Sequence, residues 1–205
     1  MLPRFLAAVL VVALPAWLSV PAADPPANDK STSAAESNYF PNKVGNTWTY
    51  EIGGKSVTTK IVRHEKMGDY MCAVLETMID GEKAATEHIA VTKQGLIRVA
   101  YKDKKIEPPI LFLKFNAQKG ESWPIDSKID QETVKGQLTR DEVDVEVPGY
   151  KGKAITVTSG PDFTVNNQPA KFVYWFAEKK GIVKEEMSLA GQEVTLMLEK
   201  FEEGK

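Results

Sequence analysis

The chain has 205 residues, of which 42% are hydrophobic, 9% aromatic and 26% charged. These values are typical of a globular domain and exclude a collagen, a coiled coil and a wholly disordered chain. The 26 Lys and Arg residues nearly balance the 28 Asp and Glu residues, so nothing predicts the clustered basic surface that nucleic-acid binding usually needs. One cysteine and two histidines leave little material for a metal site, and no cofactor is expected.

The N-terminus has the layout of a secretory signal peptide. Arg4 precedes an uncharged apolar stretch over 5–18, and Val20-Pro21-Ala22 places small residues before a cleavage point. An uncleaved anchor is the alternative, but 14 apolar residues are short for the roughly 20 that span a bilayer. We therefore expect residues 1–22 to be removed, and the mature chain to be periplasmic or extracellular with no membrane span.

Residues 23–38 are small, polar and proline-containing. They offer no large apolar side chain to bury, so they are predicted to form a flexible leader. A single β-rich domain is expected to follow over 39–205.

The domain divides into short runs rich in Val, Ile, Thr, Tyr and Phe, separated by Gly, Asp, Asn or Pro. This pattern predicts strands joined by tight turns, of which Asp80-Gly81 is a favoured hairpin pair. The predicted strands cover 47–52, 56–66, 70–79, 83–93, 96–102, 110–115, 123–129, 132–147, 151–159, 171–178, 182–189 and 193–201. The run over 132–147 is long enough to need a bend or bulge near Gly136. Short links favour sequential antiparallel pairing. We predict an all-β fold, an antiparallel meander of about twelve strands forming a curved sheet, half-barrel or barrel.

Alternation along two of these runs predicts different surroundings. In 142–147 the carboxylates of Glu142, Asp144 and Glu146 fall on one face, which predicts a solvated face and not a calcium site. In 172–176 both faces are large and apolar. One face must meet the core, and the other must meet a second layer, a ligand or a partner.

Two distant segments share a spacing that suggests an internal repeat. Phe40, Gly45 and Trp48 have the same spacing as Phe115, Gly120 and Trp123, 75 residues later. This F-x4-G-x2-W pattern suggests two related halves beginning near 39 and 114. The alternative is that a tight turn before a strand often recruits Gly, with an aromatic residue packing behind it.

Two segments carry a resemblance to known proteins. The opening YFPNKVGNTWTY (39–50) is similar to the first strand of a group of exported, mostly uncharacterised bacterial β-proteins, and YWFA followed by GIVK (174–184) is similar to their last third. In outline this group resembles the LolA/LppX-like half-barrels, which implies a curved sheet that cups a lipid or lipoprotein. The chain departs from those carriers because no segment predicts the helices that fill their concave face.

No catalytic motif is present. His64 and His88 lie within predicted strands beside Glu65 and Glu87, but neighbouring residues on a strand point to opposite faces, so both histidines are expected at the surface or rim. His64, Met67, Met71 and Cys72 cluster at a predicted hairpin with soft ligands suited to Cu(I). Core packing is the preferred interpretation of the two methionines, and a buried unreactive thiol that of Cys72.

The sequence thus predicts a non-enzymatic exported binding protein that holds an apolar or amphipathic ligand in a concave sheet. The predicted ligand-binding residues are Trp48, Trp123, Phe172, Tyr174, Trp175 and Phe176. The main alternative is an envelope or secreted interaction module, in which these aromatic residues fill a packed core and the partner is another envelope protein. A hydrolase using His64 or His88 is the third hypothesis.

Overall fold

The computed structural model describes residues 37–205, all of which belong to one antiparallel β-structure. The predicted signal peptide and nearly all of the predicted leader lie outside the described residues. The strands are β1 (Thr47–Ile52), β2 (Lys55–Met67), β3 (Tyr70–Ile79), β4 (Glu82–Val91), β5 (Gly95–Tyr101), β6 (Lys104–Lys114), β7 (Ser122–Ile129), β8 (Glu132–Val147), β9 (Tyr150–Ser159), β10 (Thr164–Val165), β11 (Gln168–Ala177), β12 (Gly181–Leu189) and β13 (Gln192–Glu202). The all-β prediction is confirmed, and only the two-residue β10 had no predicted counterpart.

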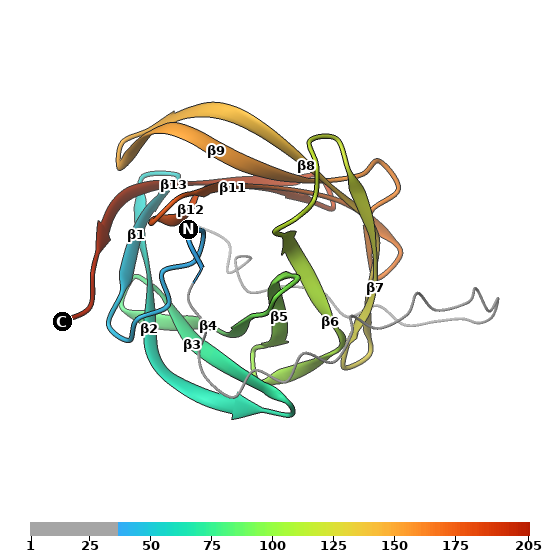
Figure 1. The fold of residues 1–205 in the computed structure, drawn as a ribbon, viewed down its shortest axis with the longest axis horizontal. Helices are drawn as coiled ribbons and strands as arrows, with labels where there is room; N and C mark the ends of the chain where they lie inside the picture. Colours follow the sequence, from blue (N-terminus) through green and yellow to red (C-terminus); the bar gives the residue numbers. More distant parts are fainter. Residues whose placement is uncertain (1–36) are drawn as a thin grey trace.

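The sheet closes on itself into a barrel (Figure 1). Consecutive strands pair from β1 to β9, and β13 returns to pair with β1, with Trp48 opposite Phe201. The ring is completed where β11 pairs with β9, with Tyr174 opposite Val157. Twelve strands therefore form the ring, and β10 adds short pairings to β8 and β11. Of the predicted alternatives, the structure takes the closed form, which leaves no long unpaired edge.

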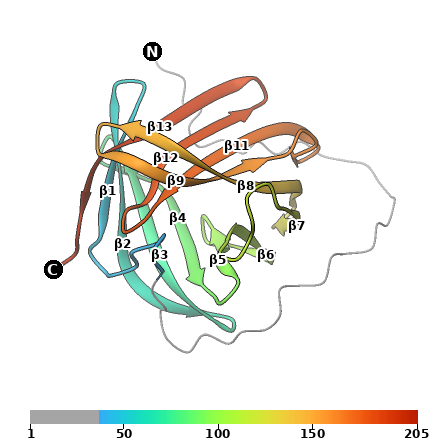
Figure 2. The same ribbon diagram turned by 45° about the horizontal axis from the view of Figure 1, so that its top comes forward.

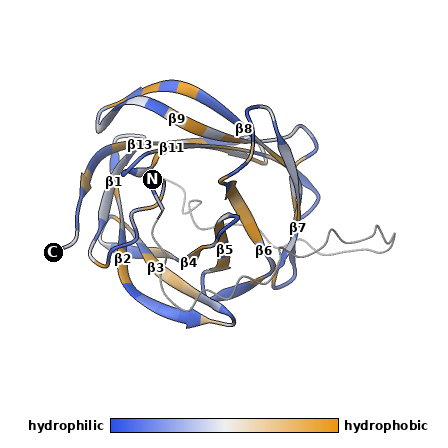
Figure 3. Ribbon diagram, in the orientation of Figure 1, coloured by the Kyte–Doolittle hydropathy of each residue, from blue (hydrophilic) through white to orange (hydrophobic). Residues whose placement is uncertain are grey.

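Side-chain alternation places the core inside the ring. In β1 every second residue is buried, with Trp48, Tyr50 and Ile52 pointing inward. In β7 the same rule buries Trp123, Ile125 and Ser127. Such period-2 burial is what a strand with one face in the core requires. Hydrophobic and hydrophilic residues can be seen alternating along β8 and β9 in Figure 3.

The outer part of the β8–β9 hairpin forms a second layer over the ring. Figures 1 and 2 show it lying outside β11, β12 and β13. At its tip, the Gly149 N–H donates to the Leu198 carbonyl at 2.7 Å, and a Cβ on Gly149 would come within 2.8 Å of the Glu199 backbone. The contacts of this second layer reach β13, while on the outer face of 172–176 Val173 is buried and Trp175 is half-buried beside Lys184. The carboxylates of Glu142, Asp144 and Glu146 are exposed, as predicted.

Gly136 in β8 pairs with Ile125 without a register shift, so the bend or bulge near it stays a prediction. The Gly136 φ of +143° lies in a region that favours glycine, and a Cβ there would lie 2.7 Å from the Cα of Phe163. The glycine therefore lets the 160–163 turn pack directly against the strand backbone.

The two F-x4-G-x2-W segments have matching local structure. Gly45 N–H donates to Ile61 O and Ile61 N–H returns to Asn46 O, while Gly120 N–H donates to Arg140 O and Arg140 N–H returns to Glu121 O. Each Trp indole N–H also donates to a backbone carbonyl, Trp48 to Lys180 at 2.6 Å and Trp123 to Leu111 at 2.7 Å. The common spacing therefore marks a common turn, and the division into two related halves stays a prediction.

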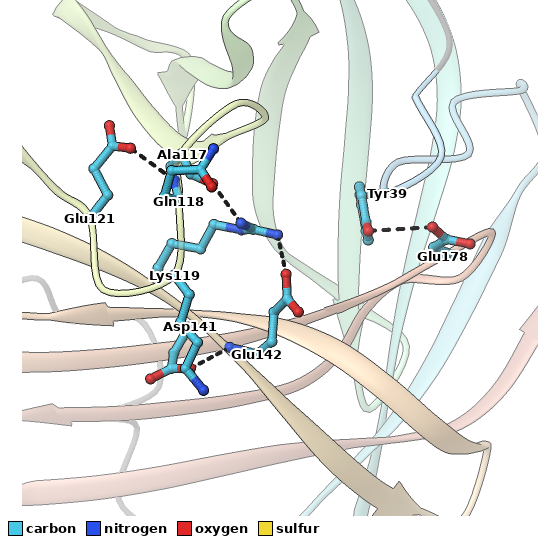
Figure 4. Close-up of polar contacts among 9 residues, drawn as sticks. Tyr39, Ala117, Gln118, Lys119, Glu121, Asp141, Glu142 and Glu178 are labelled. Carbon is cyan, nitrogen blue, oxygen red and sulfur yellow. Dashed lines mark hydrogen bonds and ion pairs between the residues drawn. The ribbon is translucent and has the colours of Figure 1, made fainter.

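A meander brings alternate turns to the same end of a barrel. One end carries the tight turns after β1, β3, β5, β7, β10 and β12. The other end carries the opening segment 37–46, the C-terminus and the long connection between β6 and β7. Polar contacts tie this second end together: Arg140 donates to the Ala117 carbonyl at 2.5 Å and to Glu142 at 2.6 Å. Tyr39 donates to Glu178 at 3.4 Å (Figure 4).

Candidate ligand-binding cavity

The ring encloses a cavity of about 320 Å³. Its wall comes from inward residues of most strands around the ring, and most of these residues are apolar. They include Trp48, Tyr50, Ile52, Val57, Leu75, Ile79, Ile89, Tyr101, Ile110, Phe112, Ile129, Val134, Leu138, Phe163, Val165, Phe172, Tyr174, Phe176, Ile182, Met187 and Leu196. The sequence could not locate this space, because the inward side chains meet only once the ring has closed.

Four of the six predicted ligand-binding residues line the cavity. Phe172, Tyr174 and Phe176 follow one another along the inner face of β11, and Trp48 joins them from β1. Phe172 and Tyr174 stack with ring centroids 6.5 Å apart. The alternation of β11 therefore places these aromatic residues together.

The other two predicted residues lie away from the cavity wall. Trp123 is buried, and its indole N–H donates to the Leu111 carbonyl at the seam between β6 and β7. Trp175 points outward, because its neighbours Tyr174 and Phe176 point inward. The ammonium of Lys184 lies 4.6 Å from the Trp175 ring centroid, a cation–π contact on the outer face. Neither residue is placed to touch a ligand inside the ring.

The closed end of the cavity has an aromatic floor. Phe40, from the segment before β1, stacks on Trp48 with ring centroids 6.4 Å apart. Phe176 is 1% exposed and lies 5.9 Å from the Phe112 ring. The hydroxyl of Tyr50 donates to the Ile182 carbonyl at 2.9 Å, which ties β1 to β12 at this level. The floor is therefore packed and hydrogen-bonded, and a ligand would have to enter at the opposite end.

The opposite end has the features of a mouth. Lining residues near its turns are only partly buried, including Ile79, Ala84, Ile129 and Met187. Ion pairs join neighbouring turns at this rim, Lys55 with Asp80 and Lys104 with Asp130. An apolar interior with a charged rim is a common form for a ligand pocket in a barrel.

A polar cluster of four side chains interrupts the apolar wall at mid-depth: Glu87 on β4, Arg98 on β5, Tyr174 on β11 and Glu185 on β12. Arg98 Nε lies 2.6 Å from Glu87 Oε2, which makes the two side chains an ion pair. Neither atom has a hydrogen bond of acceptable geometry to any residue in 37–205. The Arg98 guanidinium also lies 5.2 Å from the Phe112 ring centroid. Each side chain of this ion pair is 19% exposed, and because both line the cavity, that exposed surface faces its interior.

The cluster shifts the pKa values of its members. Burial raises the pKa of the Glu185 carboxyl to about 7, with the Glu87 carboxylate acting in the same direction and Arg98 opposing it. Burial also raises the pKa of Tyr174 above its usual range. For Arg98, burial opposes the charged form, but Glu87, Tyr174 and Glu185 together outweigh it and the pKa is raised. At neutral pH the cluster therefore holds a charged arginine that is balanced by the Glu87 carboxylate, and a second carboxyl, Glu185, whose pKa is close to the pH.

The outer wall holds a histidine–glutamate pair, His88 with Glu65, that sequence reasoning missed. His88 Nε2 lies 2.7 Å from Glu65 Oε1, and Glu65 Oε2 accepts from Arg63 at 2.6 Å. The expectation that both histidines lie at the surface or rim is wrong for His88, which is 2% exposed. Pairings of each His with its own chain neighbour were rejected correctly, but Glu65 and His88 meet across β3. That contact depends on strand register.

The residues suggested as Cu(I) ligands contact other groups of the fold. His64 Nε2 lies 2.7 Å from the Asn42 carbonyl. Cys72 is fully buried with Ala90, Ile97 and Val99 in a small cluster on the outer wall, and burial raises the pKa of its thiol to about 12. A thiol in such surroundings stays protonated and unreactive. Within 37–205, no group of three or more His, Cys, Asp or Glu side chains is arranged to hold a metal ion.

In the part of the chain that the structure describes, no helix has the length and apolarity to cross a membrane. No protein-family model matches the chain, and no curated protein matches it. One solved structure with a similar fold is a protein of Bacteroides fragilis NCTC 9343 named as an inferred exported protein with a YmcC-like fold. It has a TM-score of 0.52 and 11% identity, over 80% of this chain and 99% of that one.

A second structure is a protein of Parabacteroides distasonis ATCC 8503 named as an inferred lipoprotein. It has 10% identity over 80% of this chain and 98% of the other, but its TM-score of 0.37 is too low to support an argument. At 11% identity the likeness to the Bacteroides protein is evidence for a shared fold alone.

Proposed function

We propose that this chain is an exported, non-enzymatic protein that holds an apolar or amphipathic ligand inside its barrel. The observation that carries the proposal is the cavity of about 320 Å³ within the ring. Its volume falls at the lower end of the roughly 300–1,000 Å³ typical of small-molecule sites. Protein interiors are otherwise close-packed with few voids larger than a water molecule, so a space of this size is unusual for a core that serves only stability.

The export part of the proposal rests on the sequence. Residues 1–22 have the layout of a signal peptide, and the similar fold from Bacteroides fragilis belongs to a protein named for export. The resemblance to exported β-proteins with LolA/LppX-like outlines is part of the same proposal. A closed ring changes its form, since the ligand would sit in a lumen and not on an open concave sheet.

The non-enzymatic part rests on the polar groups that the fold brings together. His88 and Glu65 form a pair on the outer wall, where His88 is almost fully covered. In the cavity, Arg98 is paired with Glu87, so its charge is balanced by a protein carboxylate. A general base needs a substrate proton within hydrogen-bond reach, and the buried His88 ring offers no room for one.

Native mass spectrometry tests the binding proposal. The secreted chain, purified without detergent from a bacterial host that exports it, is expected to carry reproducible extra mass that extracts into organic solvent. Ala85→Trp places an indole in the cavity and is expected to remove that mass, while Val143→Trp on the exposed outer hairpin is expected to keep it. Circular dichroism would verify that both variants fold. A wild-type apo mass with no uptake from added lipid would favour the packed interaction module.

A further inference from the structure

We propose that the cavity takes a single-chain amphiphile whose polar end donates hydrogen bonds, carries no negative charge and lies against Glu87, Tyr174 and Glu185. This inference rests on the proposed function and names the chemistry of its ligand. Three properties of the interior carry it: the charge balance of the polar cluster, the position of the cluster along the strands, and the volume of the cavity.

The charge balance disfavours an anion. The cluster contains one cation, Arg98, and two carboxyl groups, Glu87 and Glu185. Arg98 Nε already lies 2.6 Å from a Glu87 oxygen, and the guanidinium packs on the Phe112 ring. No other cationic residue lines the cavity within the described chain. A third negative charge would therefore enter a poorly solvated site that has no unpaired cation to receive it.

The same groups suit a hydrogen-bond donor. Carboxylate oxygens only accept hydrogen bonds when ionised, and Glu87 lines the cavity, although its Oε2 atom is covered and held against Arg98 Nε. Glu185 supplies a second carboxyl from the opposite wall, next to the Tyr174 hydroxyl. An alcohol or an ammonium group could donate to these oxygens, and an ammonium would also offset the excess negative charge.

The position of the cluster leaves an apolar path from it to the mouth. Two residues closer to the mouth on the same strands lie Ala85, Phe172 and Met187. All three of these apolar side chains line the cavity. Around this level Ile79 and Leu196 complete the wall. A ligand with its polar end at the cluster would therefore extend an apolar tail among these side chains.

The volume favours a single chain of moderate length. At about 320 Å³ the cavity lies at the lower end of the range for small-molecule sites, so one medium-length chain suits it better than two. Ten-carbon probes are thus the appropriate test compounds: decanol as a neutral donor, decylamine as a cationic donor and decanoate as an anion with the same chain.

Isothermal titration calorimetry of the delipidated secreted chain at pH 8 tests the inference. Decanol and decylamine are each expected to bind at least tenfold more tightly than decanoate. Glu185→Gln is expected to weaken decylamine about tenfold while changing decanol less than threefold. Glu186→Gln is the matched control, because Glu186 is the next residue on β12 and pairs with Lys184 on the outer face, and it should change neither affinity.

Two results would overturn the inference in distinguishable ways. Decanoate binding as tightly as decanol would refute the proposed ligand chemistry and leave the cavity as a binding site. Failure of all three probes to bind would refute the proposed function itself, and the ligand chemistry with it. The comparison among probes uses the wild-type chain, so it stands even if a variant is poorly folded.

Discussion

Glu185 should make the stability of this protein depend on pH in a direction opposite to that of an ordinary salt-bridged carboxylate. Burial raises its pKa from the usual 4.5 to about 7 in the folded chain. Between these two values the folded protein keeps a proton that the unfolded chain releases. The free energy of unfolding therefore falls as pH rises through this window, and the contribution is constant above and below it.

The size of this effect follows from the shift. A change of one pKa unit corresponds to about 1.4 kcal/mol, so the shift of Glu185 limits its contribution to about 3 kcal/mol. Glu185→Gln preserves the shape of the side chain and removes the titration. The variant is expected to lose up to this amount of pH dependence, and at pH 8 to be more stable than the wild type.

Urea unfolding followed by tryptophan fluorescence at pH 5, 6, 7 and 8 would measure this difference. Other groups also contribute, since burial raises the pKa of Glu132 into the same window, and the His88 contact lowers the pKa of Glu65, whose contribution therefore falls below pH 4.5. Subtracting the Glu185→Gln curve from the wild-type curve cancels their contributions. Glu186→Gln, on the outer face, should reproduce the wild-type curve. Equal pH dependence in the wild type and Glu185→Gln would refute the argument that Glu185 is buried in the folded chain.

Three further predictions concern packing. Phe176→Ala should lower the free energy of unfolding by about 3–5 kcal/mol, because the ring is 1% exposed, whereas Trp175→Ala on the outer face should cost less than half as much; equal losses by urea unfolding would contradict the assigned faces. The Cys72 thiol should react with a thiol reagent only as fast as the protein unfolds, since it is fully buried with a pKa raised to about 12; rapid labelling of the native chain would show that the outer wall is open there. Gly136→Ala should destabilise by roughly 1–3 kcal/mol, because its Cβ would meet the Phe163 backbone at 2.7 Å, and an unchanged melting temperature would refute that close approach.

The matched hydrogen bonds around Gly45 and Gly120 show how far a short pattern can predict structure. Both glycines have positive φ, +93° and +79°, and each begins a turn whose Trp indole binds a backbone carbonyl. A local pattern could predict these turns because each closes between near neighbours, Asn46 N–H to Lys43 O and Glu121 N–H to Gln118 O. The bonds from the two glycines to Ile61 and Arg140 depend on the neighbouring strands. The carbonyls that the indoles reach, at Lys180 and Leu111, were unpredictable because they belong to other parts of the fold.

The sequence by itself determined the all-β class, nearly all of the strands, the need for glycine at position 136 and the two faces of 172–176. These features follow from period-2 alternation and from glycine, both of which act within a few residues of the chain. Only the tertiary structure decided that the ring closes, and hence that Tyr174 and Phe176 face a cavity while Trp123 and Trp175 do not. It also decided that Glu87, Arg98 and Glu185 share that cavity. Strand partners and their register are set by contacts between residues far apart in the chain, and no local pattern encodes them.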